Sequence, residues 1–137
     1  MRPLITYSES LAAVSAVDLE EFLAHWDFTP PHGTLLSMLK GSTVVILTHD
    51  NQSSAVCGYV AALSDQVACC YISAIEVRPE YRNQGIGTAL LNRIPERLSV
   101  YGTYHSCAPA LIPFYESAGF KQVTGMTKRR LPASNEA

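Results

Sequence analysis

The sequence predicts a mixed α/β domain, and three observations lead to this prediction. First, residues 71–91 read as an apolar strand, a polar turn with two glycines and the start of a helix. Second, two further strands joined by a polar turn precede this one, which predicts a β-meander over residues 43–77. Third, helical periodicity occurs before and after the meander, in residues 18–39 and 90–98. The expected order of elements is β-α-α-β-β-β-α-β-α-β-β.

The composition limits the number of domains and the kinds of partner. With 137 residues, 47% of them hydrophobic, the chain can build one substantial core, so a single domain over residues 1–137 is expected. The net charge of −2 provides no basic field for nucleic acid, and no apolar run approaches the ~20 residues of a membrane span. Residues 1–7 lack the apolar region of a secretion signal, which predicts a cytoplasmic protein. The polar tail, residues 132–137, is expected to be mobile.

The cysteines predict neither a metal site nor a disulfide framework. Cys57, Cys69, Cys70 and Cys107 do not follow a metal-ligand spacing. The adjacent pair, Cys69 and Cys70, should point to opposite faces of one strand. Buried, reduced cysteine is therefore expected, and no metal.

The first third of the chain predicts one strand and two short helices. The strand is residues 4–7. Asp18 with Glu21 three positions later resembles a capping box that opens an amphipathic helix. The two prolines at 30–31 must end it because they lack amide donors, and a second short amphipathic helix is expected from Gly33.

The middle of the chain predicts three strands of a meander. These strands are residues 43–48, 55–63 and 67–77. Polar turns at 49–54 and 64–66 join them. Pro79 ends the third strand near Val77, because proline has no amide to give to a sheet ladder.

The last third predicts two helices and further short strands. Pro95 should kink or interrupt the first of these helices. Gly119 should cap the second. The remaining expected elements are a strand at 101–107, the second helix at 113–118, a strand at 120–123 and a candidate partner for it at 126–131.

The turn after the third meander strand predicts a diphosphate site. Gly85 and Gly87 stand at a helix start, where unpaired N–H groups and the helix dipole favour an anion. A dinucleotide fingerprint requires a third glycine where Leu90 stands, and a P-loop requires a lysine before Thr88. Both of these nucleotide readings therefore fit poorly.

Two motifs resemble a known family. Residues 82–87, Arg-Asn-Gln-Gly-Ile-Gly, are similar to the acetyl-CoA signature Arg/Gln-x-x-Gly-x-Gly/Ala of the GNAT superfamily of N-acetyltransferases. Residues 114–120, Phe-Tyr-Glu-Ser-Ala-Gly-Phe, resemble the Phe/Leu-Tyr-x-x-x-Gly-Phe element of the same family. The order of elements is also that of GNAT domains, and the resemblance is closest to small single-domain bacterial members.

The resemblance implies a fold, a reaction and a cofactor site. The fold is that of the acyl-CoA N-acyltransferases, with a central mixed, mostly antiparallel sheet flanked by helices. Acetyl-CoA is the implied co-substrate, no metal is required, and a primary amine of a small molecule or peptide attacks the thioester directly in a ternary complex. A homodimer is left open. The residues implied to contact acetyl-CoA are Ile75, Val77, Arg82, Asn83, Gln84, Gly85, Ile86, Gly87 and Thr88.

The resemblance assigns two catalytic roles to different parts of the chain: one group acts on the leaving thiolate and another on the thioester carbonyl. Tyr115 matches the family tyrosine near the CoA sulfur and is implied to be the general acid. The alternative is that Tyr115 simply packs, with its hydroxyl at the surface. A backbone amide within 75–77, where the fourth strand separates from the fifth, is implied to polarise the thioester carbonyl.

The general base is the least defined group. Glu76 is the only carboxylate in the third meander strand and is the candidate base through water, although alternation places its side chain opposite those of Ile75 and Val77 unless a bulge intervenes. Tyr71 stands where some family members carry a strand glutamate. Other candidates acting through water are His105, Asp65 and His25.

The acceptor pocket is assigned by analogy alone, to the first two helices and their linker, with Trp26, Phe28 and His32. Ala108 stands where many members have an asparagine that binds the pantetheine arm. This difference, with the missing strand glutamate, leaves open a second class of function: a non-catalytic acyl-CoA-binding or regulatory module.

Overall fold

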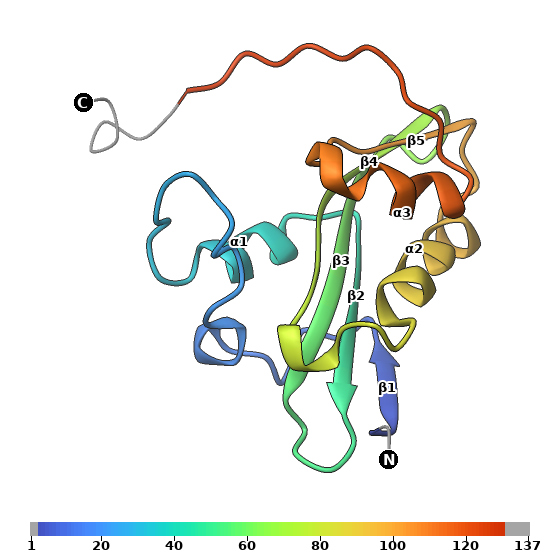
Figure 1. Cartoon of the computed structure of the whole chain (residues 1–137). Helices are drawn as coiled ribbons and strands as arrows, with labels where there is room; N and C mark the ends of the chain where they lie inside the picture. Colours follow the sequence, from blue (N-terminus) through green and yellow to red (C-terminus); the bar gives the residue numbers. More distant parts are fainter. Residues whose placement is uncertain (1–2, 131–137) are drawn as a thin grey trace.

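A five-stranded sheet forms the centre of the protein (Figure 1), in a computed structural model that describes residues 3–130. The strands lie in chain order: the first four pair antiparallel, and the fifth pairs parallel with the fourth. Their bounds are β1 Ile5–Ser8, β2 Val44–Asp50, β3 Val56–Ser64, β4 Cys69–Val77 and β5 Gly102–Tyr104. The predicted mixed, mostly antiparallel sheet is confirmed.

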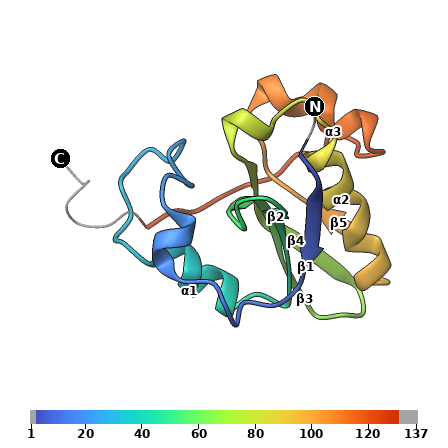
Figure 2. The same ribbon diagram turned by 90° about the horizontal axis from the view of Figure 1, so that it is seen from below.

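Helices cover both faces of the sheet, with α1 on one side and α2 and α3 on the other (Figures 1 and 2). The α-helices are α1 Thr34–Lys40, α2 Ile86–Arg97 and α3 Ile112–Ser117. Short 3₁₀ helices are η1 Ala16–Leu19, η2 Pro79–Tyr81 and η3 Pro109–Leu111. The sheet thus separates two apolar clusters, as expected for a sheet that buries both faces.

Each cluster is built by alternate residues of the central strands. On the α2 face, Val60 and Ile72 pack with Leu90 of α2. On the α1 face, Tyr59 packs with Leu39 of α1, and both side chains are fully buried. Alternation along β3 therefore supplies both cores.

A β-bulge in β4 changes which residues face which core. Ala62 pairs with Ile72 and Ala61 with Ala74, so Ser73 is an extra residue on β4. After the bulge, Ile75 faces the α2 cluster, and Glu76 faces the opposite side. The expectation that Glu76 lies opposite Ile75 is confirmed, and without the bulge Glu76 would share the face of Ile72.

The predicted first helix, opened by a capping box of Asp18 with Glu21, does not form. The capping box is formed by Ser15 and Asp18, and only η1 follows before the backbone turns left-handed at Glu21 (φ 73°) and Leu23 (φ 68°). The reason is long-range: Arg78 donates to the carbonyls of Asp18 and Glu20, and Glu76 accepts the Leu23 N–H. These bonds use groups that a helix would need.

Two other expectations about helices had different outcomes. The second short helix, beginning after Gly33, is confirmed as α1. Pro95 does not interrupt α2, which continues to Arg97. Because Pro95 lies in the last turn, its missing N–H removes only one hydrogen bond near a helix end.

The predicted strands at 120–123 and 126–131 do not form within the described residues. Residues 120–130 are extended but belong to no strand, and β5 ends at Tyr104 instead of continuing to 107. An extended segment becomes a strand only when a neighbour pairs with its N–H and C=O groups, and this segment has no such neighbour among residues 3–130. The predicted mobile tail, 132–137, lies outside the described residues.

The cysteines follow the expected alternation in β4, where Cys70 is buried and Cys69 is exposed. Cys57 is buried as well, whereas Cys107 is exposed, so burial holds for only part of the set. Over residues 3–130, no three potential ligands among His, Cys, Asp and Glu come together as a metal site. No helix in the same range is long and apolar enough to span a membrane.

Candidate active site

The turn between β4 and α2 has the geometry of an anion-binding loop. Asn83 (φ 62°) and Gly85 (φ 82°) take left-handed conformations, and Gly85 is the N-cap of α2. The Arg82 Nε donates to the Val77 carbonyl at 2.9 Å, which ties the turn to the end of β4. The first amides of a 12-residue helix are thereby presented at the C-terminal end of β4.

The two glycines of the turn serve different purposes. A Cβ on Gly85 would meet nothing within 4 Å, so what requires glycine there is the left-handed backbone and an open approach. A Cβ on Gly87 would lie 3.4 Å from Phe114 Cζ of α3. Gly87 therefore allows close packing of α2 against α3, a role that the motif alone did not indicate.

β4 and β5 separate beyond three residue pairs. They pair only where Cys69–Tyr71 meets Gly102–Tyr104, and in the part of the chain that the structure describes, residues 72–77 of β4 have no strand on that side. The side chains of Ile75 and Val77 face the α2 cluster, next to the turn at 82–88. This gap is the place where the family resemblance implies a backbone amide for the thioester carbonyl.

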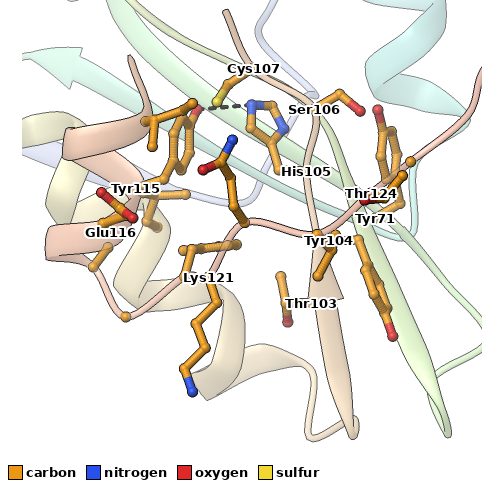
Figure 3. Close-up of a pocket in the computed structure, with 18 of the residues that line it drawn as sticks. Tyr71, Thr103, Tyr104, His105, Ser106, Cys107, Tyr115, Glu116, Lys121 and Thr124 are labelled. Carbon is orange, nitrogen blue, oxygen red and sulfur yellow. Dashed lines mark hydrogen bonds between the residues drawn. The ribbon is translucent and has the colours of Figure 1, made fainter. Parts of the chain in front are cut away.

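Tyr115 and His105 lie together near the point where the strands separate (Figure 3). The His105 Nδ1 lies 2.8 Å from the Ile72 carbonyl, so it carries the proton and donates. Its Nε2 is then the acceptor for the Tyr115 hydroxyl at 2.9 Å. The position of the phenol hydroxyl is thus fixed by β4 through His105.

Burial sets the protonation of this pair. Desolvation lowers the pKa of His105, with a smaller opposing effect from its bond to the Ile72 carbonyl. Burial also raises the pKa of Tyr115 to about 12. At neutral pH the pair is an uncharged imidazole and a protonated phenol. Tyr115 is only 6% exposed, so its alternative placement with a surface hydroxyl is not what the structure shows.

Glu76 lies on the opposite face of β4 with both oxygens occupied. It accepts the Leu23 N–H at 3.0 and 3.2 Å and the Tyr59 hydroxyl at 2.6 Å. His25 Nδ1 is 3.4 Å from the same carboxylate. The neighbouring carboxylate and burial together raise the pKa of Tyr59 strongly, with burial the larger cause. Glu76 thus anchors the loop that replaces the predicted first helix.

The remaining candidate bases, Asp65 and His25, lie away from the Tyr115–His105 pair. The Asp65 carboxylate accepts the N–H groups of Val67, Ala68 and Cys69, which lowers its pKa and closes the turn between β3 and β4. His25 is mostly exposed beside Glu76. Neither is brought to Tyr115.

The predicted acceptor residues lie in the loop before α1. The rings of Trp26 and Phe28 are 5.3 Å apart, both half-buried, and His32 is exposed. Asp27 between them forms a two-bond ion pair with Arg129. The structure therefore groups Trp26 with Phe28 but leaves His32 at the surface.

A cavity of about 990 Å³ lies beside β5 and contains the His105 and Tyr115 side chains in its wall (Figure 3). Its other walls are α3, the last turns of α2 and the extended segment after α3. None of the residues of the turn at 82–88 lines it. It is thus separate from that turn and lies beside β5.

Residues 40–122, more than half of the chain, match the acetyltransferase (GNAT) domain family, and the chain belongs to this family. A protein of Deinococcus radiodurans R1 assigned as an acetyltransferase is 30% identical. The match covers 97% of this chain and 100% of that one, with a TM-score of 0.85. A GNAT family acetyltransferase of Streptococcus pneumoniae TIGR4 is 24% identical over 93% of this chain and 98% of that one, with a TM-score of 0.73.

One structure of the same fold contains a CoA derivative. AAC(6')-Iy, in complex with the bisubstrate analog CoA-S-monomethyl-acetylneamine, is 11% identical over 95% of this chain and 99% of that one, with a TM-score of 0.66. At that identity the likeness shows the fold alone. No curated protein matches the chain by sequence. Family and fold together support acyl transfer in general terms.

Proposed function

We propose that this chain is a single-domain N-acetyltransferase that moves an acetyl group from acetyl-CoA to a primary amine of a small molecule or peptide. The observation that carries the proposal is the arrangement around β4: an anion-binding turn at its end, a gap toward β5, and a buried tyrosine hydroxyl near the start of that gap. A CoA conjugate bound by a protein of the same fold supports the cofactor. The cytoplasmic location remains a prediction.

Acetyl-CoA would be held mainly by backbone groups. The diphosphate would accept hydrogen bonds from backbone N–H groups at the start of α2, within the predicted set Arg82–Thr88. The pantetheine arm would enter the gap beside Ile75 and Val77. When bound, the cofactor supplies an activated acetyl group as a thioester. The N–H groups of β4 that face the gap are available to its carbonyl oxygen.

The leaving thiolate would be stabilised by Tyr115. The amine nitrogen forms a bond to the carbonyl carbon, the carbon–sulfur bond breaks, and its electron pair goes to sulfur. With a thiol pKa near 8.5, complete proton transfer from a phenol of pKa about 12 costs about 5 kcal/mol. Tyr115 therefore acts chiefly as a hydrogen-bond donor to sulfur, turning its hydroxyl away from His105.

Proton removal from the amine would proceed through water to the solvent. Glu76 is the only carboxylate on β4, and the Leu23 N–H and the Tyr59 hydroxyl already occupy it. His105 uses its acceptor nitrogen for Tyr115 while the amine loses its proton, before the Tyr115 hydroxyl turns to the sulfur. Neither is free to act as a dedicated base, although either can contact a water chain.

The occupied state of Glu76 also favours the second candidate, an acyl-CoA-binding module without efficient chemistry. Ala108, which caps η3 where many members place an asparagine, points in the same direction. Binding of acetyl-CoA is common to both candidates, and turnover separates them.

The test is thiol release from acetyl-CoA across a broad panel of primary amines, with the product read by mass shift. The acetyltransferase predicts release above background with at least one amine and a matching gain of one acetyl group. Calorimetry on the same preparation reports acetyl-CoA binding. Binding without release across the panel would support the module, and absence of binding would reject both.

A further inference from the structure

The loop of residues 20–28, which follows η1, has a backbone conformation that its sequence does not favour. Glu21 and Leu23 are left-handed, with φ of 73° and 68°. At such angles Cβ lies close to the following carbonyl oxygen, so residues other than glycine, asparagine and aspartate rarely adopt them. Contacts from outside the loop must therefore hold this conformation.

Arg78, the residue after β4, makes several of these contacts. Its Nη1 and Nη2 donate to the carbonyls of Glu20 and Asp18 at 2.8 and 3.0 Å. Its Nε donates to the Val56 carbonyl at the start of β3, at 2.7 Å. The guanidinium also lies over the Phe22 ring, 4.2 Å from the ring centroid. One side chain therefore joins the loop and the residues before it to β3.

The contacts of Arg78 require the shape of arginine as well as its charge. Its main chain is fixed, because the Arg78 N–H donates to the Cys57 carbonyl of β3 at 2.8 Å. No ion pair among residues 3–130 includes Arg78, and its partners are carbonyl oxygens and an aromatic ring. A planar guanidinium can donate to three carbonyls at once, whereas a lysine has all its donors on one nitrogen.

The end of β4 contacts this loop on one face and borders the predicted cofactor site on the other. Ile75 and Val77 face the α2 cluster, beside the predicted diphosphate turn. Glu76 lies on the α1 face and accepts the Leu23 N–H of the loop. Arg78 binds the same loop two residues later, as alternation along a strand predicts. Neighbouring residues thus fix the loop beside the site where the cofactor is expected.

We propose that Arg78 is a positioning residue, which holds the loop of residues 20–28 in its strained conformation and thereby fixes the acceptor pocket assigned to Trp26 and Phe28. This inference rests on the proposed function, because the pocket requires an amine acceptor. Arg78 acts through the loop and touches neither the cofactor nor the reacting atoms. Its loss should therefore weaken amine binding and leave acetyl-CoA affinity almost unchanged.

The first test uses the fluorescence of Trp26, which is the only tryptophan in the sequence and lies in the loop. Arg78→Lys should shift its emission to longer wavelength and increase quenching by acrylamide. Arg93→Lys is a matched control, because Arg93 also stacks on an aromatic ring, 4.0 Å from the Tyr7 centroid, on the α2 face. It should behave as the wild type does.

Two results of this test would overturn the proposal. One is unchanged emission and quenching of Trp26 in Arg78→Lys. The other is loss of slow amide exchange in the core of β3, because the substitution would then unfold the domain instead of releasing the loop. The proposal predicts slow exchange in β3 for both variants.

The second test asks whether Arg78 acts against backbone strain. Glycine adopts left-handed φ without a Cβ penalty, so Glu21→Gly lowers the cost of the loop conformation. Added to Arg78→Lys, it should move Trp26 quenching back toward the wild-type value. Glu20→Gly removes the same charge at an ordinary φ of −58° and should restore nothing. Equal quenching in the two double variants would contradict the proposal.

The third test connects the loop to the reaction, with an amine that the wild type acetylates. In Arg78→Lys the KM for the amine should rise at least about tenfold, with kcat and the acetyl-CoA Kd within about threefold of the wild type. Glu21→Gly in the same chain should recover part of the KM. A shift of Trp26 fluorescence with an unchanged amine KM would overturn the link between loop and acceptor. If no amine is acetylated, the proposed function fails together with this link, whereas the fluorescence tests still decide whether Arg78 holds the loop.

Discussion

The polar groups beside the two faces of β4 differ in how many partners they have. On the α2 face, the Tyr115 hydroxyl makes one hydrogen bond, to a neutral histidine. On the α1 face, the Glu76 carboxylate receives a backbone N–H and a tyrosine hydroxyl and lies near His25. A group with a spare site can serve a substrate, whereas a fully engaged group stabilises the fold. The Tyr115 face is thus suited to chemistry and the Glu76 face to structure.

The largest expected effect is on kcat and comes from Tyr115, on the α2 face of β4. Tyr115→Phe keeps the ring and removes the hydroxyl, so kcat should fall about 10- to 10³-fold while acetyl-CoA affinity stays within about twofold. Steady-state kinetics and calorimetry measure the two quantities. Tyr101→Phe, at a 95% exposed position, is the control and should keep full rate. A full-rate Tyr115→Phe enzyme would remove Tyr115 from the reaction.

The next largest effect is expected on acetyl-CoA affinity, from a substitution in the predicted diphosphate turn at residues 82–88. Gly85→Val places a branched side chain in open space at the start of α2 and strains a left-handed residue, so the Kd for acetyl-CoA should rise at least about tenfold. Gly33→Val is a matched control, because Gly33 also caps a helix at φ 87° with nothing near its Cβ, on the other face of the sheet. Calorimetry that finds equal affinity in the two variants would exclude the turn as the cofactor site.

Substitution of Glu76, on the α1 face of β4, should change the stability of the fold. Glu76→Gln leaves one acceptor oxygen for the Leu23 N–H and the Tyr59 hydroxyl, so the free energy of unfolding should fall by about 1–3 kcal/mol. Denaturant unfolding measures this change. Glu80→Gln, on an exposed residue of η2, is the control. Unchanged stability in Glu76→Gln would mean that the carboxylate does not anchor the loop.

The smallest effect concerns His105 and the pH dependence of stability. Because burial lowers its pKa, the unfolded chain binds a proton before the folded chain does as the pH falls below about 6.5. The stability contribution of neutral His105 is therefore complete above that pH and is lost toward lower pH. His105→Gln should flatten the acid side by up to about 1.4 kcal/mol per pH unit, whereas His32→Gln, at an exposed position, should not. If the curves of unfolding free energy against pH are parallel for the wild type and His105→Gln, the lowered pKa of His105 is contradicted.

Prediction from sequence succeeded where the signals are local. Pro79 ends β4 near Val77, and Gly85 caps the start of α2, since each acts on its own backbone. The first helix failed because Glu76 and Arg78, more than 50 residues away, capture its amides and carbonyls. The predicted strands after α3 do not form because no segment among residues 3–130 pairs with them.

The candidate site was predictable to a similar extent. Motif spacing selected the turn at 82–88 and Tyr115 as candidates, and alternation correctly placed the Glu76 side chain opposite that of Ile75. The bond between Tyr115 and His105 was not predictable, because no pattern links a histidine after β5 to a tyrosine in α3. The packing role of Gly87 against Phe114 also depends on how α2 and α3 meet.

The most direct test of the division between the two faces is the pH profile of kcat/KM, measured in parallel for the wild type, Glu76→Gln and His105→Gln with an active alkyl amine. With proton removal through water, kcat/KM should rise with pH toward the amine pKa near 10. Neither variant should lower it by more than about tenfold, and with the pKa of Tyr115 at about 12 the phenol should not limit the rise. A loss of about 10³-fold in either variant, together with loss of a limb between about pH 6 and 8, would make that residue the base and contradict the account.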